Sequence, residues 1–476
     1  MSGTPENAEP EPEGGGGPPL ATVLPAGEGS PRLSRITVAR EVAPLVGGIG
    51  ACGLVTAFLN STASLFLVDA VRAAPLLIGL FFAARGAVSI VVSLAAGAVS
   101  DRLPDRRLLL VIGGVGGAIG GVCFAELRDY VAVLVTGAVF FSIGGVTFNQ
   151  LFAYANDYAR ARERPVTSFT MAVRSVFSAS WVIGPPAGIF LLTKFGFGPL
   201  YLTVGGLCLV TAALGLGLRR LPPPPAPAAR LAPRSAAFLS LPGRTWLLLG
   251  ALVALGVVNQ MYNIDIALYV TKTLHLETQL VGWIVGLGAA LEIPIMIVAG
   301  RFADRFGKLR VVVASAVGAI VFFCLLPLAK SVAPLLALQV LNAAWTAVAL
   351  SIPMVMIQEE APGGAGAGAA LYSTTFMSAS LLAGAVTGVT ATAIGYGNVF
   401  WVCAGLSVFA TGLLVARAVR GTGRQGDSRG PFGLIKKVLP GGGGGGDGPG
   451  GGGAGDDVRS AGASRQRAVR VASVTG

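Results

Sequence analysis

The chain has few charged residues. Asp, Glu, Lys and Arg make up 12% of its 476 residues, whereas a soluble domain usually has about 25%. Hydrophobic residues make up 53% of the chain, and its mean hydropathy is +0.72. This composition excludes an ordinary soluble globular protein and predicts an integral membrane protein.

Histidine and cysteine are also scarce. The one histidine, His275, leaves a metal cluster or a His-based catalytic triad without its usual residues. Each of the five cysteines lies in an apolar run without CxxC spacing, which is typical of small buried core residues. No glycine-rich stretch continues into the GK[ST] of a phosphate loop. We therefore expect no enzyme, no metal and no cofactor.

Long apolar runs recur along the chain. A helix needs about 20 apolar residues to cross a bilayer core, whereas barrel strands are about 10 residues long and alternate. The runs have helical length and do not alternate. They predict an all-α membrane protein with twelve spans, over residues 42–66, 76–98, 107–126, 130–157, 167–193, 198–218, 245–271, 279–300, 309–329, 332–358, 367–393 and 397–417.

The formal net charge of +12 is divided among short loops rather than gathered on one face. An even number of spans puts both termini on one side, and the arginine-rich loops fall on that side. By the positive-inside rule, both termini are expected in the cytoplasm and the chain in the cell membrane. The charge thus indicates topology and not nucleic-acid binding. Only five basic residues fall in the opposite loops: Arg72, Arg128, Lys194, Lys272 and Lys330.

A proline-rich segment after the sixth span divides the chain into six plus six spans, because proline cannot continue a helix. The ends of the chain are rich in Gly, Pro or Glu and are expected to be disordered. The predicted organisation is a cytoplasmic tail over 1–41, a six-helix bundle over 42–218, a cytoplasmic linker over 219–244, a second bundle over 245–418 and a cytoplasmic tail over 419–476.

One loop sequence occurs twice. GAVSDRLPDRRLLL, residues 97–110, follows the second span, and GRFADRFGKLRVVV, residues 300–313, follows the eighth. Asp101 and Asp304 are 203 residues apart and hold the same place in each half. A duplicated transporter fold explains this repeat.

The repeated loop resembles the G-x-x-x-D-R-x-G-x-[RK] motif of the major facilitator superfamily. The resemblance implies twelve helices in two pseudo-symmetric six-helix bundles that alternate between inward- and outward-open states. It also implies that the Asp–Arg pairs hold the halves together on the cytoplasmic side. The first copy departs from the motif at Pro104, where the family usually has Gly. The gating residues expected here are Asp101, Arg102, Arg106, Asp304 and Arg305.

The fifth span contains SASWVIGPPAGIF, residues 178–190. Gly184, Pro185 and Gly188 match the G-P-x-x-G antiporter motif of the same superfamily, which is found mostly in exporters. Prolines remove backbone donors and bend a helix, and glycines admit a neighbouring helix. We add these three residues to the expected gate.

Five further stretches resemble the bacterial sugar efflux transporter family. They are FTMAVRSVFSASWVIGPP, NQMYNIDIALYV, GLGAALEIPIMIVAG, QVLNAAW and ALYSTTF, and the resemblance covers residues 45–415. It implies export of sugars. In the seventh span the chain has Asp265 and Ala267 where the family is expected to have Asn and Pro.

Four charged residues lie deep within the predicted spans: Arg85, Arg174, Asp265 and Glu292. Charges there are costly, by about 2.5 to 3.5 kcal/mol on insertion scales, so each marks a candidate functional site. Two cations and two anions could pair across a cavity. The alternative is a set of buried ion pairs that fix helix register.

Glu292 lies midway through the eighth span, two residues before Pro294. A carboxylate at this depth can take up and release a proton as a cavity opens to either side. We predict that Glu292 carries the proton, binds the substrate or does both, with Asp265 as a second proton-coupling group.

Polar residues at helical spacing mark further faces. Asn and Asp side chains suit vicinal hydroxyls, and a Tyr ring suits the C–H face of a sugar. Interhelical hydrogen bonding is the alternative. The predicted substrate-binding residues are Asn149, Gln150, Arg174, Trp181, Asn259, Tyr262, Asn263, Asp265, Glu292, Gln339 and Asn342.

The sequence thus predicts a secondary transporter that exports sugars or related polyhydroxylated compounds by proton antiport and alternating access. Its expected partners are a sugar-like substrate, protons and the lipid bilayer, with no nucleic acid, and we expect a monomer. A multidrug/proton antiporter of the same superfamily is the first alternative. A non-transporting membrane sensor is the second.

Overall fold

The computed structural model describes residues 35–100, 103, 105–221, 241–361 and 364–422. Twelve helices in this part of the chain are long and apolar enough to cross a membrane, which confirms the all-α membrane fold. They are α1 Arg35–Asp69, α2 Pro75–Ser100, α3 Arg107–Glu126, α4 Tyr130–Ala161, α5 Val166–Phe195, α6 Phe197–Gly217, α8 Gly243–Leu268, α9 Thr278–Phe306, α10 Lys308–Leu325, α11 Val332–Glu360, α12 Gly364–Ile394 and α13 Val399–Thr422.

Three short helical segments complete the described chain. The π-helix η1, Tyr269–Thr273, continues α8, and the 3-10 helices η2, Leu326–Leu328, and η3, Tyr396–Asn398, follow α10 and precede α13. Three predicted boundaries differ from the helices. The predicted tail over 1–41 includes the first residues of α1, which begins at Arg35, the predicted linker over 219–244 includes the start of α8 at Gly243, and α13 continues past residue 418 to Thr422. Residues 1–34, 222–240 and 423–476 lie outside the described residues.

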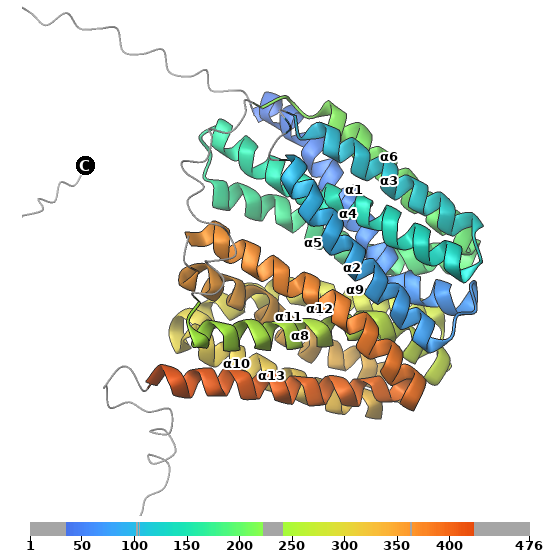
Figure 1. Cartoon of the computed structure of the whole chain (residues 1–476), viewed down its shortest axis with the longest axis vertical. Coiled ribbons are helices and arrows are strands. Elements are labelled where there is room, and N and C mark those ends of the chain that lie inside the picture. Colours follow the sequence, from blue (N-terminus) through green and yellow to red (C-terminus); the bar gives the residue numbers. More distant parts are fainter. Residues whose placement is uncertain (1–34, 101–102, 104, 222–240, 362–363, 423–476) are drawn as a thin grey trace, which may run out of the picture. The chain divides into compact units, whose positions relative to one another are not determined.

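Figure 1 shows α1 to α6, in blue to green, gathered on one side of α8 to α13, in lime to red. We call these groups the N-half and the C-half, and interpret them as the two predicted six-helix bundles. The helix ends near Ser100 and Phe306, where the repeated loops lie, form what we call the basic end. The ends near Asp69 and Thr273 form the opposite end.

The halves touch through α2 on α12 and α5 on α9. A Cβ atom added to Gly79 of α2 would lie 2.3 Å from Gly388 Cα of α12, so the two backbones are in direct contact. In the second pair of helices, a Cβ on Gly282 would lie 2.8 Å from Pro186 Cα. Small residues allow such close approach in membranes, where lipid gives no hydrophobic drive for helix association. We call this packing the interhalf contact.

The interhalf contact follows the repeat. Gly282 follows Gly79 by 203 residues, and Gly388 follows Pro185 by the same number, as Asp304 follows Asp101. Asp69 and Lys272, which form an ion pair between the halves, are also 203 residues apart. The glycines, Pro185 and the ion pair lie toward the opposite end, where two symmetric helix pairs join the halves.

At the basic end, the described ion pairs lie within a half. In the N-half, Arg162 and Arg219 both bind Glu41, at 2.6 and 2.5 Å. In the C-half, Lys308 pairs with Glu359 and Arg417 with Glu360. No ion pair among the described residues joins the halves at this end. The two ends of the molecule therefore differ in how the halves are joined.

Asp105, in the loop before α3, also belongs to the basic end. Arg107 Nη2 donates to its Oδ2 at 2.7 Å, and Arg220 lies 3.6 Å from the same oxygen. The hydrogen bonds from Arg107 lower the pKa of the Asp105 carboxyl below its usual value, and the charge of Arg220 acts in the same direction.

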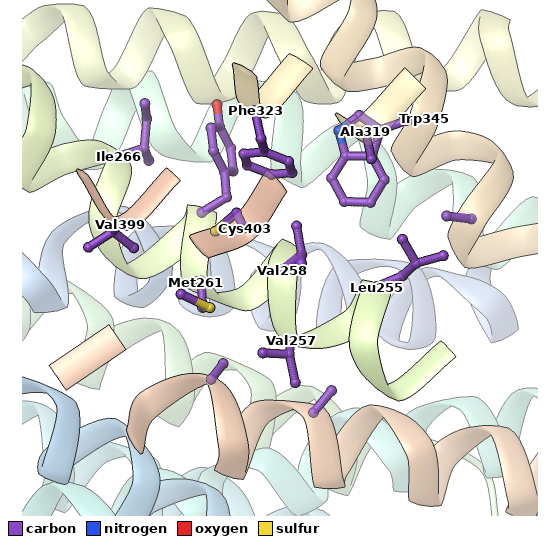
Figure 2. Close-up of a cluster of buried hydrophobic side chains, with 14 of the residues drawn as sticks. Leu255, Val257, Val258, Met261, Ile266, Ala319, Phe323, Trp345, Val399 and Cys403 are labelled. Carbon is purple, nitrogen blue, oxygen red and sulfur yellow. The ribbon is translucent and has the colours of Figure 1, made fainter. Parts of the chain in front are cut away.

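Each half has its own aromatic core. Phe66, Phe124 and Tyr201 pack together in the N-half, with ring centroids 4.9 to 5.2 Å apart: the two Phe rings are stacked and Tyr201 is edge-on to both. In the C-half, Tyr262 packs edge-on against Phe322 at 5.6 Å. Figure 2 shows the buried side chains of α8 next to Phe323, Trp345 and Cys403 of the neighbouring helices. These cores hold the helices that carry the candidate site.

Candidate transport site

Charged groups of the two halves interact electrostatically between α5 and α9, without forming an ion pair among the described residues. Arg174 of α5 interacts electrostatically with Glu292 of α9 and with the hydroxyl of Tyr372 on α12. Arg174 is exposed and Glu292 is half-buried. Both groups that interact with Arg174 belong to the C-half, so the interaction crosses the boundary between the halves. Of the four cation–anion pairs that the sequence allows, Arg174 and Glu292 are the one whose members interact among the described residues.

Tyr372 is held in place by its own hydrogen bond. Its hydroxyl donates to the carbonyl of Leu350 on α11 at 2.7 Å. The ring therefore spans α11 and α12, with its hydroxyl near Arg174 and Glu292. Tyr372 is not among the substrate-binding residues predicted above, and its electrostatic interaction with Arg174 and Glu292 adds it to the candidate site.

Behind Glu292, α9 packs closely on α11. Gly288 lies one helical turn before Glu292, and a Cβ there would lie 3.2 Å from Gln339 Oε1 and 3.5 Å from Asn342 Nδ2. The glycine thus lets α9 rest directly on the polar residues of α11. This contact fixes the height of Glu292 along α11.

Gln339 and Asn342 belong to a buried hydrogen-bond chain. Tyr262 OH and Asn342 Nδ2 both donate to Gln339 Oε1, at 3.1 Å each, and Trp345 Nε1 donates to Asn342 Oδ1 at 3.1 Å. Gln339 Nε2 donates to the carbonyl of Leu335. All four side chains of this hydrogen-bond chain are buried, and they satisfy one another's hydrogen-bonding groups. In this conformation they form a supporting layer, not a surface that a substrate can touch.

Trp345 was not among the residues predicted from the sequence. It follows Asn342 by three residues and therefore lies on the same helical face. This spacing could have identified it, since a buried indole needs an acceptor for its N–H.

The predicted asparagines of α8 are more accessible. Asn259 and Asn263 are half-buried, and Asn263 Nδ2 donates to the carbonyl of Asn259 at 2.9 Å and to its Oδ1 at 3.3 Å. Their neighbour Gln260 donates to Ser380 Oγ of α12 at 3.1 Å. This face of α8 thus lies next to α12, the helix that carries Tyr372.

Asp265 lies apart from these groups. It is fully buried, and neither of its carboxylate oxygens accepts a hydrogen bond from a described residue. Its electrostatic interactions are with Tyr269, Tyr396 and Cys403. Asp265 therefore sits in the interior of the C-half, beside α13, and its proton-coupling role stays a prediction.

The two predicted residues of α4 point in different directions. Asn149 is exposed, whereas Gln150 is buried and accepts a hydrogen bond from Ser100 Oγ at 3.1 Å. Ser100 in turn accepts from Arg106 Nη1 at 2.9 Å, and Arg106 pairs with Asp157 at 3.0 Å. Gln150 thus connects to the predicted gate, and Asn149 is the one of the two that is open to a substrate.

Trp181 lies two turns beyond Arg174 on α5. Its ring is half-buried, and its indole N–H is buried without an acceptor among the described residues. A buried donor without a partner is costly. The indole is therefore suited to donate a hydrogen bond to a bound hydroxyl.

The predicted gating residues have different surroundings. Asp101 and Arg102 lie outside the described residues. Asp304 and Arg305 are exposed in the last turn of α9, with the Arg305 guanidinium 5.2 Å from the Phe306 ring centroid. Within the described chain neither forms an ion pair with the N-half.

The proline-glycine motif of α5 contacts two helices. Cβ atoms on Gly184 and Gly188 would lie 2.4 Å from Ala57 Cβ and 3.0 Å from Phe58 Cδ1 of α1. Pro185 O faces α9, 3.0 Å from a Cβ placed on Gly282. The glycines therefore bring α5 close to α1, and the prolines take part in the interhalf contact.

Comparison with known proteins gives consistent matches. The family model described as Major Facilitator Superfamily matches residues 45–276 and 248–443. Sugar efflux transporter B of Salmonella typhimurium is 34% identical over 354 residues, which are 73% of this chain and 88% of that protein. Sugar efflux transporter A of Escherichia coli is 33% identical over 363 residues, 75% of this chain and 91% of that protein.

Among solved structures, the nucleoside transporter NupG matches with a TM-score of 0.69 at 15% sequence identity. The match covers 79% of this chain and 98% of that structure. At this identity the likeness concerns the fold alone.

Proposed function

The chain belongs to the Major Facilitator Superfamily, and from this premise we propose that it exports sugars or related small polyhydroxylated compounds by proton antiport. Relatives named sugar efflux transporters, about 33% identical over most of the chain, support the substrate class. The observation that supports the mechanism is the electrostatic interaction of Arg174 in the N-half with Glu292 and Tyr372 in the C-half.

Glu292 is the proposed coupling group. A deprotonated Glu292 neutralises Arg174 and accepts hydrogen bonds from substrate hydroxyls, whereas a proton on Glu292 removes both interactions. Substrate and proton therefore compete for one carboxylate, which is the requirement for antiport. Asp265 is kept as a second proton site, inside the C-half.

The sugar contacts are proposed to come from the accessible amides of Asn149, Asn259 and Asn263, which can donate to and accept from hydroxyls. The buried indole N–H of Trp181, which has no acceptor among the described residues, would donate to a hydroxyl of bound substrate. Tyr262, Gln339 and Asn342 act from behind, because their hydrogen bonds hold α9 and Glu292 against α11.

Alternating access is proposed to use the difference between the two ends. The interhalf contact closes the opposite end, so substrate enters this conformation from the basic end. The positive-inside rule assigns the basic end and both termini to the cytoplasm, the side from which an exporter loads. In the outward-open state the interhalf contact would separate, and the halves would meet at Asp304, Arg305 and the first repeated loop.

Transport by the purified full chain in proteoliposomes tests the proposal. With an inward-directed proton gradient across vesicles loaded with labelled sugar, we expect efflux against a sugar gradient, and none from protein-free vesicles. A labelled hydrophobic cation in parallel vesicles is the matched comparison. Movement of the cation without the sugar would overturn the proposal in favour of a multidrug antiporter, and movement of neither would favour the sensor.

A further inference from the structure

The charges inside the spans do not balance between the halves. Of the four charged residues at depth, Arg174 and Glu292 interact with each other, and Asp265 interacts with Tyr269, Tyr396 and Cys403 in the C-half interior. Arg85 is left over. A cation at this depth needs an anionic or hydrogen-bonding partner to offset its desolvation.

The guanidinium of Arg85 has no such partner among the described residues. It makes no ion pair and donates no hydrogen bond there, and the titratable group that interacts with it is the buried hydroxyl of Tyr201. The bond from Ser142 Oγ goes to the backbone carbonyl of Arg85, at 3.4 Å, and leaves the side chain free. The residue is half-buried and thus partly open.

Arg85 lies next to the interhalf contact. A Cβ on its neighbour Gly86 would lie 2.9 Å from Leu381 Cα of α12. One residue before Leu381, Ser380 accepts the hydrogen bond from Gln260, which stands next to Asn259 on α8. Arg85 therefore lies next to the point at which α12 contacts both α2 and α8.

The repeat places Arg85 at the depth of the candidate site. Gly288 follows Arg85 by 203 residues, the same shift that relates the two pairs of the interhalf contact. Gly288 rests on Gln339 and Asn342, one turn before Glu292. Arg85 holds the matching position in the N-half.

We propose that the transported compound is a sugar acid with one negative charge and that Arg85 binds its carboxylate. This inference rests on the proposed sugar export and names the substrate class of that site. A guanidinium binds a carboxylate through two parallel hydrogen bonds, which fits a planar carboxylate at the end of a polyhydroxylated chain. The hydroxyls remain for Asn259, Asn263 and Glu292.

A free inorganic anion has the same charge as the substrate carboxylate and is the alternative source of the negative group. If chloride fills this role, replacing it with a bulky organic sulfonate will slow the transport of a neutral sugar. If the substrate supplies the charge, this replacement changes nothing.

Competition between three ligands tests the inference without any variant. Labelled glucose efflux from proteoliposomes of the full chain is measured with added glucuronate, its neutral methyl ester or unlabelled glucose. We expect glucuronate to inhibit at about tenfold lower concentration than either neutral compound, since loss of a buried charge contact costs at least that much. Equal inhibition by all three would overturn the inference.

Variants locate the effect. Arg85→Gln should lower glucuronate transport about tenfold and leave glucose transport within about twofold, and Arg85→Lys should recover part of the glucuronate rate. Arg420→Gln, which removes an exposed arginine at the end of α13, is the control and should change neither rate. An equal loss for both sugars in Arg85→Gln would assign Arg85 to structure alone and overturn the inference.

The two proposals fail in different ways. If glucose moves and glucuronate neither moves nor competes, sugar export stands and the sugar-acid inference is wrong. If neither sugar moves while the hydrophobic cation does, the proposed function fails and the inference falls with it. Slower glucose transport after chloride replacement would assign the anion to the solution and not to the substrate.

Discussion

Asn60 of α1 and Asn263 of α8 hold equivalent positions in the two halves, 203 residues apart. Each amide donates to the carbonyl four residues earlier, at 2.8 and 2.9 Å. Two residues later the halves differ. Thr62 bonds to its own helix at Phe58 O and lies 3.4 Å from Tyr201 OH, whereas its counterpart Asp265 has no hydrogen bond from a described residue.

Equivalent positions of the two halves also differ at the candidate site. Arg85 of the N-half stands where the C-half has Gly288, and Glu292 of the C-half stands where the N-half has Ser89. Arg174 likewise has Met377 as its counterpart. The helical frame is thus repeated, but the cations lie in the N-half and the carboxylates in the C-half. The proposed coupling chemistry therefore needs residues of both halves.

The largest effect is expected from removing the carboxylate that the C-half has and the N-half lacks. Glu292→Gln should reduce proton-driven uphill transport to the level of protein-free vesicles, while downhill exchange continues, because an amide cannot carry the proton. Glu277→Gln, at the exposed start of α9, is the matched control and should transport normally. Uphill transport by Glu292→Gln would assign coupling to another group.

Next in size is the interhalf contact. Gly388→Leu would press a side chain against the backbone of Gly79 and should lower the free energy of unfolding by about 3 kcal/mol. Because the contact is repeated, Gly282→Leu should cost a similar amount. Thermal unfolding in detergent measures both, with Gly405→Leu as the control, since a Cβ there meets nothing within 4 Å. Equal stability of all three would refute close packing.

Breaking the buried hydrogen-bond chain of the C-half should lower the free energy of unfolding more than a change at the equivalent position of the N-half. Gln339→Leu removes the acceptor that Tyr262 and Asn342 share and should cost about 2 kcal/mol of unfolding free energy. Its counterpart Thr136 bonds only to its own helix, at Ala132 O and Val133 O. Thr136→Val should therefore cost well under half as much in the same unfolding measurement. Equal losses of unfolding free energy would show that the hydrogen-bond chain in the C-half adds no stability.

Thr62 and Asp265 hold equivalent positions, and giving each the residue of the other should change the stability in opposite directions. Asp265→Thr replaces a buried carboxylate without a partner by a hydroxyl that can bond to its own helix, and should stabilise the protein by about 1 kcal/mol. Thr62→Asp should destabilise it. Chemical denaturation measures both. A loss of stability in Asp265→Thr would mean that the carboxylate is held by a group absent from the described contacts.

The smallest effect is expected at Asp105. Since Arg107 lowers the folded-state pKa of this carboxyl, its contribution is present at neutral pH and is lost as the pH falls through the folded-state value. The side chain is 34% exposed, so screening limits the contribution to less than about 1 kcal/mol. Asp105→Asn should flatten the loss of thermal stability between neutral and acidic pH. An unchanged pH profile would contradict the pairing with Arg107.

The fold followed from the sequence because hydropathy and loop charge do not depend on how helices pack. The span predicted over 107–126 coincides with α3, and that over 130–157 falls inside α4, which continues to Ala161. The predicted membership of the superfamily is confirmed by the family model and by relatives. Helix ends outside the bilayer were harder to predict, because their hydropathy no longer distinguishes them from loops.

The site could be predicted from the sequence only in part. Helical spacing shows which residues share a face of a helix, but not which other helix that face contacts. Asn149 and Gln150 are adjacent in sequence, yet one is exposed and the other binds Ser100. Tyr262 and Asp265 share a broad face of α8, but Tyr262 meets α11 while Asp265 interacts with groups of η3 and α13. Which neighbour a polar group meets depends on tertiary packing that no pattern within one span contains.

The ion pair of Asp69 with Lys272 joins two positions that are each other's counterparts. Contacting counterparts lie on the pseudo-twofold axis, so in an ancestor made of two identical halves the same side chain would have faced itself. Two like charges would repel there, so the attractive pair requires a different residue in each half. At this position the two halves are not interchangeable.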